Sequence, residues 1–130
     1  MFKSVYLDNA ATTVVYREAA EKAFEMMTHN FGNPSSLHTM GVKAEQMVDA
    51  ARRQVASLIG CRAGSIIFTS GGTEANNLAL FGAVEARKRA GRHIVTTAVE
   101  HSSVTTVCDE LEGNGYEITR LVPDKNGCIP

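Results

Sequence analysis

The sequence feature that most limits the fold is an alternation of short extended segments and helical segments in the second half of the chain. Residues 65–69, 93–97 and 116–122 are rich in β-branched and aromatic residues, as strands are. Helical patterns over residues 74–90 and 104–113 separate them, with glycines at the boundaries. Short connections between alternating strands and helices predict right-handed crossovers and a largely parallel sheet with helices on both faces. The fold class is therefore predicted to be α/β.

The first half of the chain is predicted to hold two helices and two polar loops. Apolar residues at three- and four-residue steps predict one helix over residues 16–29, and a clearer apolar stripe predicts another over residues 44–59. Gly60 supplies the stop of the second helix. Residues 8–13 form a loop of small polar side chains that something else must hold, and residues 30–36 collect turn formers.

Composition limits the class of protein. A chain of 130 residues makes one domain at most and is long enough to hold a core of its own. Its 44% hydrophobic and 21% charged residues, with a net charge of -1, are typical of a soluble globular protein and give no basic stripe for nucleic acid. No apolar run approaches the roughly 20 residues that span a bilayer, and no signal-peptide core is present, so we expect a cytoplasmic protein without membrane contact.

Cysteine and histidine spacing argues against a metal site. The three cysteines form no CxxC pair, and the four histidines show no ligand spacing. The sequence therefore predicts no bound metal and reduced thiols. Cys108 shares an apolar stripe with its helix and is predicted to lie in the core, and no cysteine shows the features of a nucleophile.

Two segments follow predicted parallel strands and should meet at the sheet edge where ligands bind, namely residues 70–74 and 99–103. Gly71 and Gly72 let the backbone approach a ligand and take unusual dihedrals, and the free N–H groups of the following helix favour an anion such as phosphate. Thr73 adds a hydroxyl donor. The alternative is a tight strand-to-helix turn that the fold alone requires.

His101 lies in the second of these segments. A histidine here could stack on a flat ligand or move a proton, because an unperturbed imidazole changes charge near neutral pH. The alternative is a surface or helix-capping residue, which is the commoner use of a histidine before a helix.

Four segments resemble the cysteine desulfurases of the class V aminotransferase group, in the order in which they occur: YLDNAATT at 6–13, FGNPSSLH at 31–38, FTSGGTEANN at 68–77 and VEHSSV at 99–104. The resemblance covers essentially the whole chain and implies a three-layer α/β/α fold with a mostly parallel sheet that binds pyridoxal 5'-phosphate (PLP). Family members are several-fold longer. We therefore expect residues 1–15 to be an N-terminal arm and residues 16–130 to be the first part of an incomplete PLP-binding large domain.

The resemblance also implies roles for single residues. Gly72 and Thr73 correspond to the family's phosphate-binding positions, which agrees with the anion site expected from the glycine turn. His101 corresponds to the histidine that stacks on the cofactor ring and takes part in proton transfer. Ala11 and Thr12 lie in the segment that lines the substrate entrance, and residues 33–36 resemble a loop near the active site and dimer interface.

The activity implied is conversion of L-cysteine to L-alanine by a homodimeric enzyme, with sulfur passed as a persulfide to an acceptor protein for iron–sulfur cluster or thio-cofactor assembly. Val14 replaces a proline that many relatives carry, which puts no role in doubt. The lysine that holds the cofactor, the aspartate on its ring nitrogen and the cysteine that takes the sulfur all lie in relatives beyond the position of Pro130.

The chain alone is accordingly expected to be inactive, and to self-associate through uncovered apolar faces and an open sheet edge. The alternatives are a related class V lyase or aminotransferase, such as a selenocysteine lyase, and a standalone phosphate-binding module.

Overall fold

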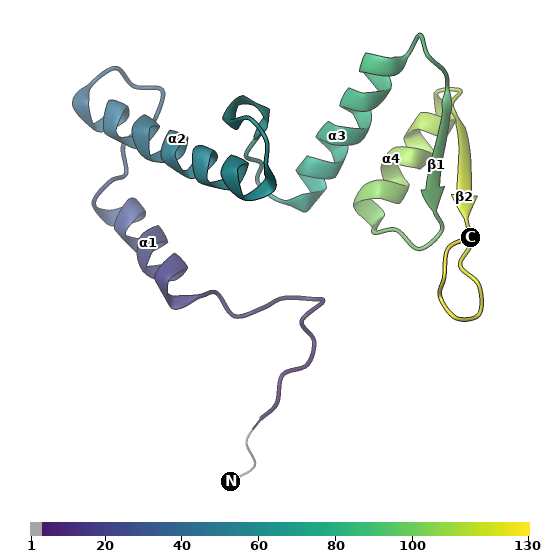
Figure 1. The fold of residues 1–130 in the computed structure, drawn as a ribbon, viewed down its shortest axis with the longest axis horizontal. Helices are drawn as coiled ribbons and strands as arrows, with labels where there is room; N and C mark the ends of the chain where they lie inside the picture. Colours follow the sequence, from purple (N-terminus) through teal and green to yellow (C-terminus); the bar gives the residue numbers. More distant parts are fainter. Residues whose placement is uncertain (1–3) are drawn as a thin grey trace. The chain divides into compact units, whose positions relative to one another are not determined.

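The computed structural model describes residues 4–130, which divide after Ile66 into two compact units. Figure 1 shows their elements along the chain. The first unit holds the helices α1 (Arg17–Thr28) and α2 (Thr39–Ile59) and the short 3-10 helix η1 (Ala63–Ser65). The second unit holds α3 (Gly72–Arg87), β1 (His93–Thr97), α4 (Ser102–Gly113) and β2 (Glu117–Leu121).

Both helices expected in the first unit are present. The α2 helix begins at Thr39, five residues before the apolar stripe that predicts it, because the ring of His38 caps its first turn. Nδ1 of His38 accepts a hydrogen bond from the N–H of Gly41 at 3.3 Å. At the other end Gly60 adopts the left-handed conformation with φ 70°, which confirms the predicted stop.

The α2 helix packs closely against the loop that precedes it. A Cβ atom on Gly41 would collide with the carbonyl group of Ser36, so only glycine permits this approach. The loop holds its own shape, since the side chain of Asn33 accepts a hydrogen bond from the N–H of Ser35 at 2.9 Å. Ala44 and Ala56 are the buried hydrophobic residues of the helix.

The second unit contains the sheet. Strands β1 and β2 pair in parallel, from His93 opposite Glu117 to Thr97 opposite Leu121. The α4 helix connects them and packs against β2, and α3 packs against α4. Val107, Cys108 and Leu111 lie on one buried face of α4, and Cys108 is fully buried, as predicted. The parallel pairing and its helical connection confirm the α/β fold class.

The strand predicted over residues 65–69 is absent. Ser65 ends the 3-10 helix and Ile66 is extended, with φ -89° and ψ 127°. A strand also requires a hydrogen-bonded neighbour, and within residues 4–130 the only pairing is between β1 and β2. Helices on both sheet faces are likewise absent from the second unit, because α3 contacts α4 and only α4 contacts a strand.

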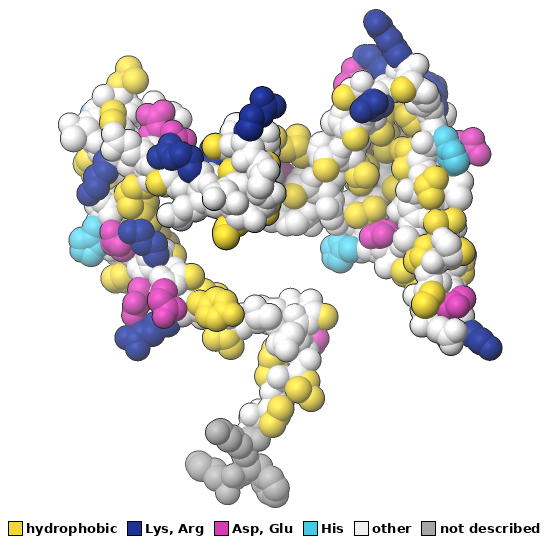
Figure 2. All heavy atoms as spheres, viewed as in Figure 1, with side chains coloured by type: hydrophobic (Ala, Val, Ile, Leu, Met, Phe, Trp, Pro, Cys, Tyr) yellow, Lys and Arg dark blue, Asp and Glu magenta, His cyan; other side chains and the backbone are white. Residues whose placement is uncertain are grey.

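The core is smaller than the chain length predicts. Within residues 4–130 the buried hydrophobic side chains are Ala44, Ala56, Val107, Cys108 and Leu111. In contrast, Phe24 and Met27 on the apolar stripe of α1 are 62% and 70% exposed, and Figure 2 shows hydrophobic side chains on the surface of both units. In the same residues, no helix is long and apolar enough to cross a lipid bilayer.

Candidate functional site

The two segments that the sequence analysis places at one sheet edge do meet in the second unit. Helices α3 and α4 begin at the same end of this unit, beyond the carboxyl ends of β1 and β2 (Figure 1). Nδ2 of Asn76 on α3 donates a hydrogen bond to Oγ of Ser103 on α4 at 2.8 Å, which joins the two helix starts. A pocket of about 360 Å³ opens there, lined by Gly72, Thr73, Asn76, His101 and Ser103.

All three residues predicted to bind the cofactor, Gly72, Thr73 and His101, therefore line one pocket. A second pocket, of about 300 Å³, shares two of its lining residues, Thr73 and Ser103. Thr73, predicted to bind the cofactor phosphate, thus lines both pockets.

The start of α3 leaves backbone donors free. The N-cap residue is Gly71, which has no side chain to accept a hydrogen bond from the helix. The first backbone hydrogen bond of the helix runs from the N–H of Ala75 to the carbonyl of Gly71 at 3.1 Å. The N–H groups of Gly72, Thr73 and Glu74 consequently have no acceptor within residues 67–130. Free N–H groups and the positive end of the helix dipole together favour an anion.

The two glycines are not required by the turn itself. Gly71 is fully extended, with φ 168° and ψ 179°, so the unusual dihedrals expected there are absent. A Cβ atom added at Gly71 or Gly72 would meet no atom within 4 Å. The alternative of a turn that needs glycine for the fold therefore loses its physical reason, and the open space beside the free donors is where a ligand can approach closely.

Glu74 is the acidic residue in the first turn of α3, and its carboxylate is hydrogen-bonded to Ser70. Oε2 of Glu74 accepts hydrogen bonds from the N–H of Ser70 at 2.6 Å and from its hydroxyl at 2.7 Å. The hydroxyl and then the backbone bond lower the pKa of Glu74 below its ordinary value. The carboxylate is thus held by Ser70 and does not bond to the free N–H groups.

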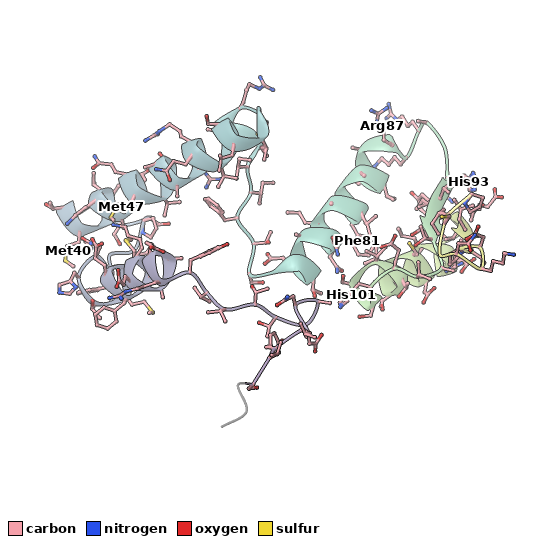
Figure 3. All side chains as sticks on the ribbon, turned by 60° about the horizontal axis from the view of Figure 1, so that its bottom comes forward. Met40, Met47, Phe81, Arg87, His93 and His101 are labelled. Carbon is pink, nitrogen blue, oxygen red and sulfur yellow. The ribbon has the colours of Figure 1, made fainter. Side chains whose placement is uncertain are left out.

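His101 is the N-cap residue of α4, so the capping alternative describes its local role correctly. Its Nδ1 accepts a hydrogen bond from the N–H of Ser103 at 3.1 Å and lies 2.9 Å from Oγ of Ser103. Figure 3 shows His101 at the end of α4 that lies near the start of α3. Capping uses one ring nitrogen only. The Nε2 atom has no hydrogen-bond partner within residues 67–130, and so the ring can serve the pocket as well.

Sequence reasoning missed Asn76 and Ser103. Asn76 lies three residues after Thr73, which places both side chains on one helix face. Ser103 follows a predicted N-cap by two residues, at a position whose N–H a capping side chain bonds. Helical spacing from the two predicted residues was therefore the available signal.

Ala11 and Thr12, predicted to contact substrate, belong to the first unit. Tyr6 holds their loop, in agreement with the expectation that these small polar residues need another group to fix them. The hydroxyl of Tyr6 donates to the carbonyl of Asp8 at 2.7 Å, and the N–H of Ala11 bonds to the same carbonyl at 3.2 Å. The substrate role of Ala11 and Thr12 remains a prediction.

These features define a parallel α/β protein with a pocket where two helices begin beyond the strand ends. The sequence matches the family described as aminotransferase class-V over residues 5–130. The chain belongs to this family.

Two curated relatives are named as cysteine desulfurases. The chain is 49% identical over 125 residues to the putative cysteine desulfurase IscS 1 of Bacillus subtilis, covering 96% of this chain and 33% of that protein. It is 50% identical over 129 residues to the cysteine desulfurase IscS of Shewanella oneidensis, covering 97% of this chain and 32% of that one. The chain thus spans about a third of the length of the curated relatives it matches.

Two solved structures are similar to this chain in both fold and sequence. A NifS-like protein superimposes with a TM-score of 0.90 at 33% identity, over 97% of this chain and 35% of the other. The structure of SspA in complex with cysteine superimposes with a TM-score of 0.84 at 34% identity, over 93% of this chain and 35% of the other. The resemblance to cysteine desulfurases and the expectation of a partial α/β domain of the PLP-transferase kind are confirmed.

Proposed function

We propose that the pocket at the starts of α3 and α4 binds PLP and that this chain is part of a PLP-dependent cysteine desulfurase. The observation that carries the proposal is the start of α3, which no side chain caps, so that the N–H groups of Gly72 and Thr73 are free. Open space surrounds these donors, because a Cβ atom at Gly71 or Gly72 would meet no atom within 4 Å. The pocket has the donor set for a phosphate, and its volume of about 360 Å³ lies in the range of small-ligand sites.

Three of the lining residues, Gly72, Thr73 and His101, have direct roles in this proposal. The N–H groups of Gly72 and Thr73 and the hydroxyl of Thr73 hold the phosphate, while Glu74 stays bonded to Ser70 and leaves the donors free. His101 would lie against the ring of the cofactor and offer Nε2 to the pocket. When bound, PLP supplies an electron sink for reactions at the α-carbon of an amino acid.

The substrate we propose is L-cysteine, with L-alanine as product and sulfur passed as a persulfide to an acceptor protein for iron–sulfur cluster or thio-cofactor assembly. The names of the relatives favour this reaction over that of a selenocysteine lyase or another class V enzyme. The structure of SspA with cysteine supports the choice of substrate. We further propose a cytoplasmic homodimer in which residues 1–15 form an arm, of which residues 1–3 lie outside the described part of the chain. Residues 16–130 form the first part of the large domain, with Ala11 and Thr12 facing the substrate.

This chain by itself is proposed to bind the cofactor but not to turn over cysteine. No lysine or cysteine is among the residues that line either pocket of the site. Covalent attachment of PLP and acceptance of sulfur both require such a residue. We expect no release of sulfide or alanine from L-cysteine and PLP above a heat-denatured control, and clear release would contradict this part of the proposal.

Binding is best tested with pyridoxamine 5'-phosphate, because it lacks the aldehyde that reacts with surface lysines. We expect it to raise the thermal midpoint of the chain, whereas pyridoxamine without the phosphate does not. Thr73→Ala removes one hydrogen bond to a charged group and should weaken binding about tenfold or more. Gly72→Val should abolish binding, because its branched side chain fills the space beside the free donors. The midpoint of the free chain should change little, since a Cβ atom at this position meets no atom within 4 Å.

Thr39→Ala is the matched control, because Thr39 also opens a helix, α2, in the other unit. It should leave binding unchanged. A midpoint that responds equally in the Thr73→Ala, Gly72→Val and wild-type chains would contradict the site. A response to inorganic phosphate as strong as to pyridoxamine 5'-phosphate would instead favour a standalone phosphate-binding module.

A further inference from the structure

The hydrogen bonds around His101 determine which ring nitrogen carries the proton. A backbone N–H can only donate, and the N–H of Ser103 points to Nδ1 of His101 at 3.1 Å. Nδ1 must therefore present a lone pair, which makes it the unprotonated nitrogen of the neutral ring.

Asn76 supports the same state from the neighbouring helix. Its amide nitrogen also only donates, and it lies 2.8 Å from Oγ of Ser103. Because Oγ of Ser103 accepts from Asn76, its own hydrogen is free to point to Nδ1 of His101 at 2.9 Å. The three side chains form a directed chain of donors from α3 to the ring. Ser103 is only 7% exposed, so water competes little for its hydroxyl.

The state of Nδ1 determines the state of Nε2, the other ring nitrogen of His101. With Nδ1 occupied as an acceptor, the neutral ring carries its proton on Nε2, which has no partner within residues 67–130. His101 lines the same pocket as Gly72 and Thr73. The ring therefore offers the pocket a hydrogen-bond donor.

We propose that Ser103 and Asn76 are positioning residues that hold neutral His101 as the Nε2–H tautomer, so that it presents a donor to whatever occupies the pocket. The assignment of PLP as that occupant rests on the proposed function, but the tautomer itself is a property of the free chain. The occupant is accordingly expected to place an electron-rich atom or ring face next to Nε2.

The test is nitrogen NMR of the 130-residue chain labelled with ¹⁵N, without cofactor and at a pH where the ring is neutral, because the two tautomers give distinct nitrogen shifts. We expect wild-type His101 to be the Nε2–H tautomer. Asn76→Asp preserves the shape but accepts from the Ser103 hydroxyl, which turns the oxygen lone pair toward Nδ1. This variant should raise the Nδ1–H fraction at His101, by up to about tenfold in the ratio of tautomers. Ser103→Ala should raise it less, since the backbone donor remains.

Asn77→Asp is the matched control, because it adds the same charge one residue away, where the amide bonds to the carbonyl of Thr73 at 2.9 Å. It should not change the tautomer of His101. His93 serves as an internal reference in every spectrum, since its Nε2 lies 2.7 Å from Oγ1 of Thr119 and it should not respond to any of these variants.

Two results would overturn the proposal: an Nδ1–H tautomer at His101 in the wild type, or the same tautomer ratio in wild type, Asn76→Asp and Ser103→Ala while the amide spectrum shows an intact second unit. Failure of the proposed function looks different. In that case pyridoxamine 5'-phosphate does not bind, and the tautomer of His101 and its response to Asn76→Asp remain as expected.

Discussion

The pairing of Ser70 with Glu74 leaves the first N–H groups of α3 without a side-chain acceptor. In many helices the N-cap side chain satisfies the first N–H groups, but here the cap is Gly71 and the acidic residue of the first turn bonds outward to Ser70. The hydroxyl and N–H of Ser70 stabilise the charged form of Glu74, and so its pKa is lowered. The pair thus holds the segment before the helix without using the donors at Gly72 and Thr73.

We predict that Ser70→Ala raises the pKa of Glu74 toward its ordinary value of 4.5, because the side-chain hydrogen bond is the largest cause of the lowered value. A pKa that is lowered in the folded chain stabilises the fold above 4.5, and this contribution is lost as the pH falls through the folded-state value. The variant should therefore lose part of the acid-sensitive stability. Carboxyl NMR titration of the two chains measures the change.

Asp124 is an internal control in the same titration. Its pKa is also lowered, by the backbone N–H groups of Cys128 and Asn126, and no contact connects it with Ser70. It should titrate identically in both chains. An unchanged pKa of Glu74 in the Ser70→Ala chain would show that the hydroxyl does not hold the carboxylate.

At the scale of elements, α4 carries most of the packing in the second unit. Its buried face, formed by Ser103, Val107, Cys108 and Leu111, lies between α3 and β2. Arg120 on β2 adds ion pairs to Asp109 at 2.6 Å and to Glu112 at 2.9 Å, but these pairs are exposed and contribute little. The position of His101 depends on this helix, since the histidine is its N-cap.

We predict that Leu111→Ala destabilises the second unit by about 2–5 kcal/mol, because it empties a site that is only 4% exposed. Urea denaturation followed by circular dichroism measures the loss. The urea concentration at the midpoint of unfolding should fall markedly, because few other buried side chains stabilise the second unit.

Leu78→Ala is the matched control, because it makes the same chemical change on α3 at a side chain that is 49% exposed. The expected cost is within about 1 kcal/mol. Equal losses for the two variants would contradict the role assigned to the buried face of α4.

On the scale of the whole molecule, apolar surface remains uncovered within each unit. In the second unit β1 pairs only with β2, and Val95 on β1 is 59% exposed. In the first unit α1 has no buried residue. Unpaired strand edges and contiguous apolar faces are the surfaces through which proteins associate.

We predict that the chain self-associates, with a mass that rises with concentration in size-exclusion chromatography coupled to light scattering. Val95→Lys should reduce the association, because it places a charge on the open face of the sheet. Val14→Lys should not, since it makes the same change in the first unit at a loop residue that is 90% exposed. A single monomeric species of the wild type at high concentration would count against this prediction.

Much of the fold and the site was determined by local sequence. The strand at 93–97 agrees with the structure to the residue, and the helices and Gly60 stop follow from spacing and capping, which act over a few neighbouring residues. Gly72, Thr73 and His101 were predicted to meet because parallel strands bring their carboxyl ends to one edge. They do line one pocket, but residues 65–69 form no strand, and the packing of α3 on α4 brings the three residues together.

Tertiary structure decided what depends on a distant partner. Residues 65–69 have the composition of a strand, but a strand exists only through hydrogen bonds to another strand, and within residues 4–130 the only strand pairing is between β1 and β2. The apolar stripe of α1 likewise predicts a helix correctly without revealing whether anything covers it. The contact of Asn76 with Ser103, 27 positions apart, orients His101, and only the packing of α3 on α4 creates it.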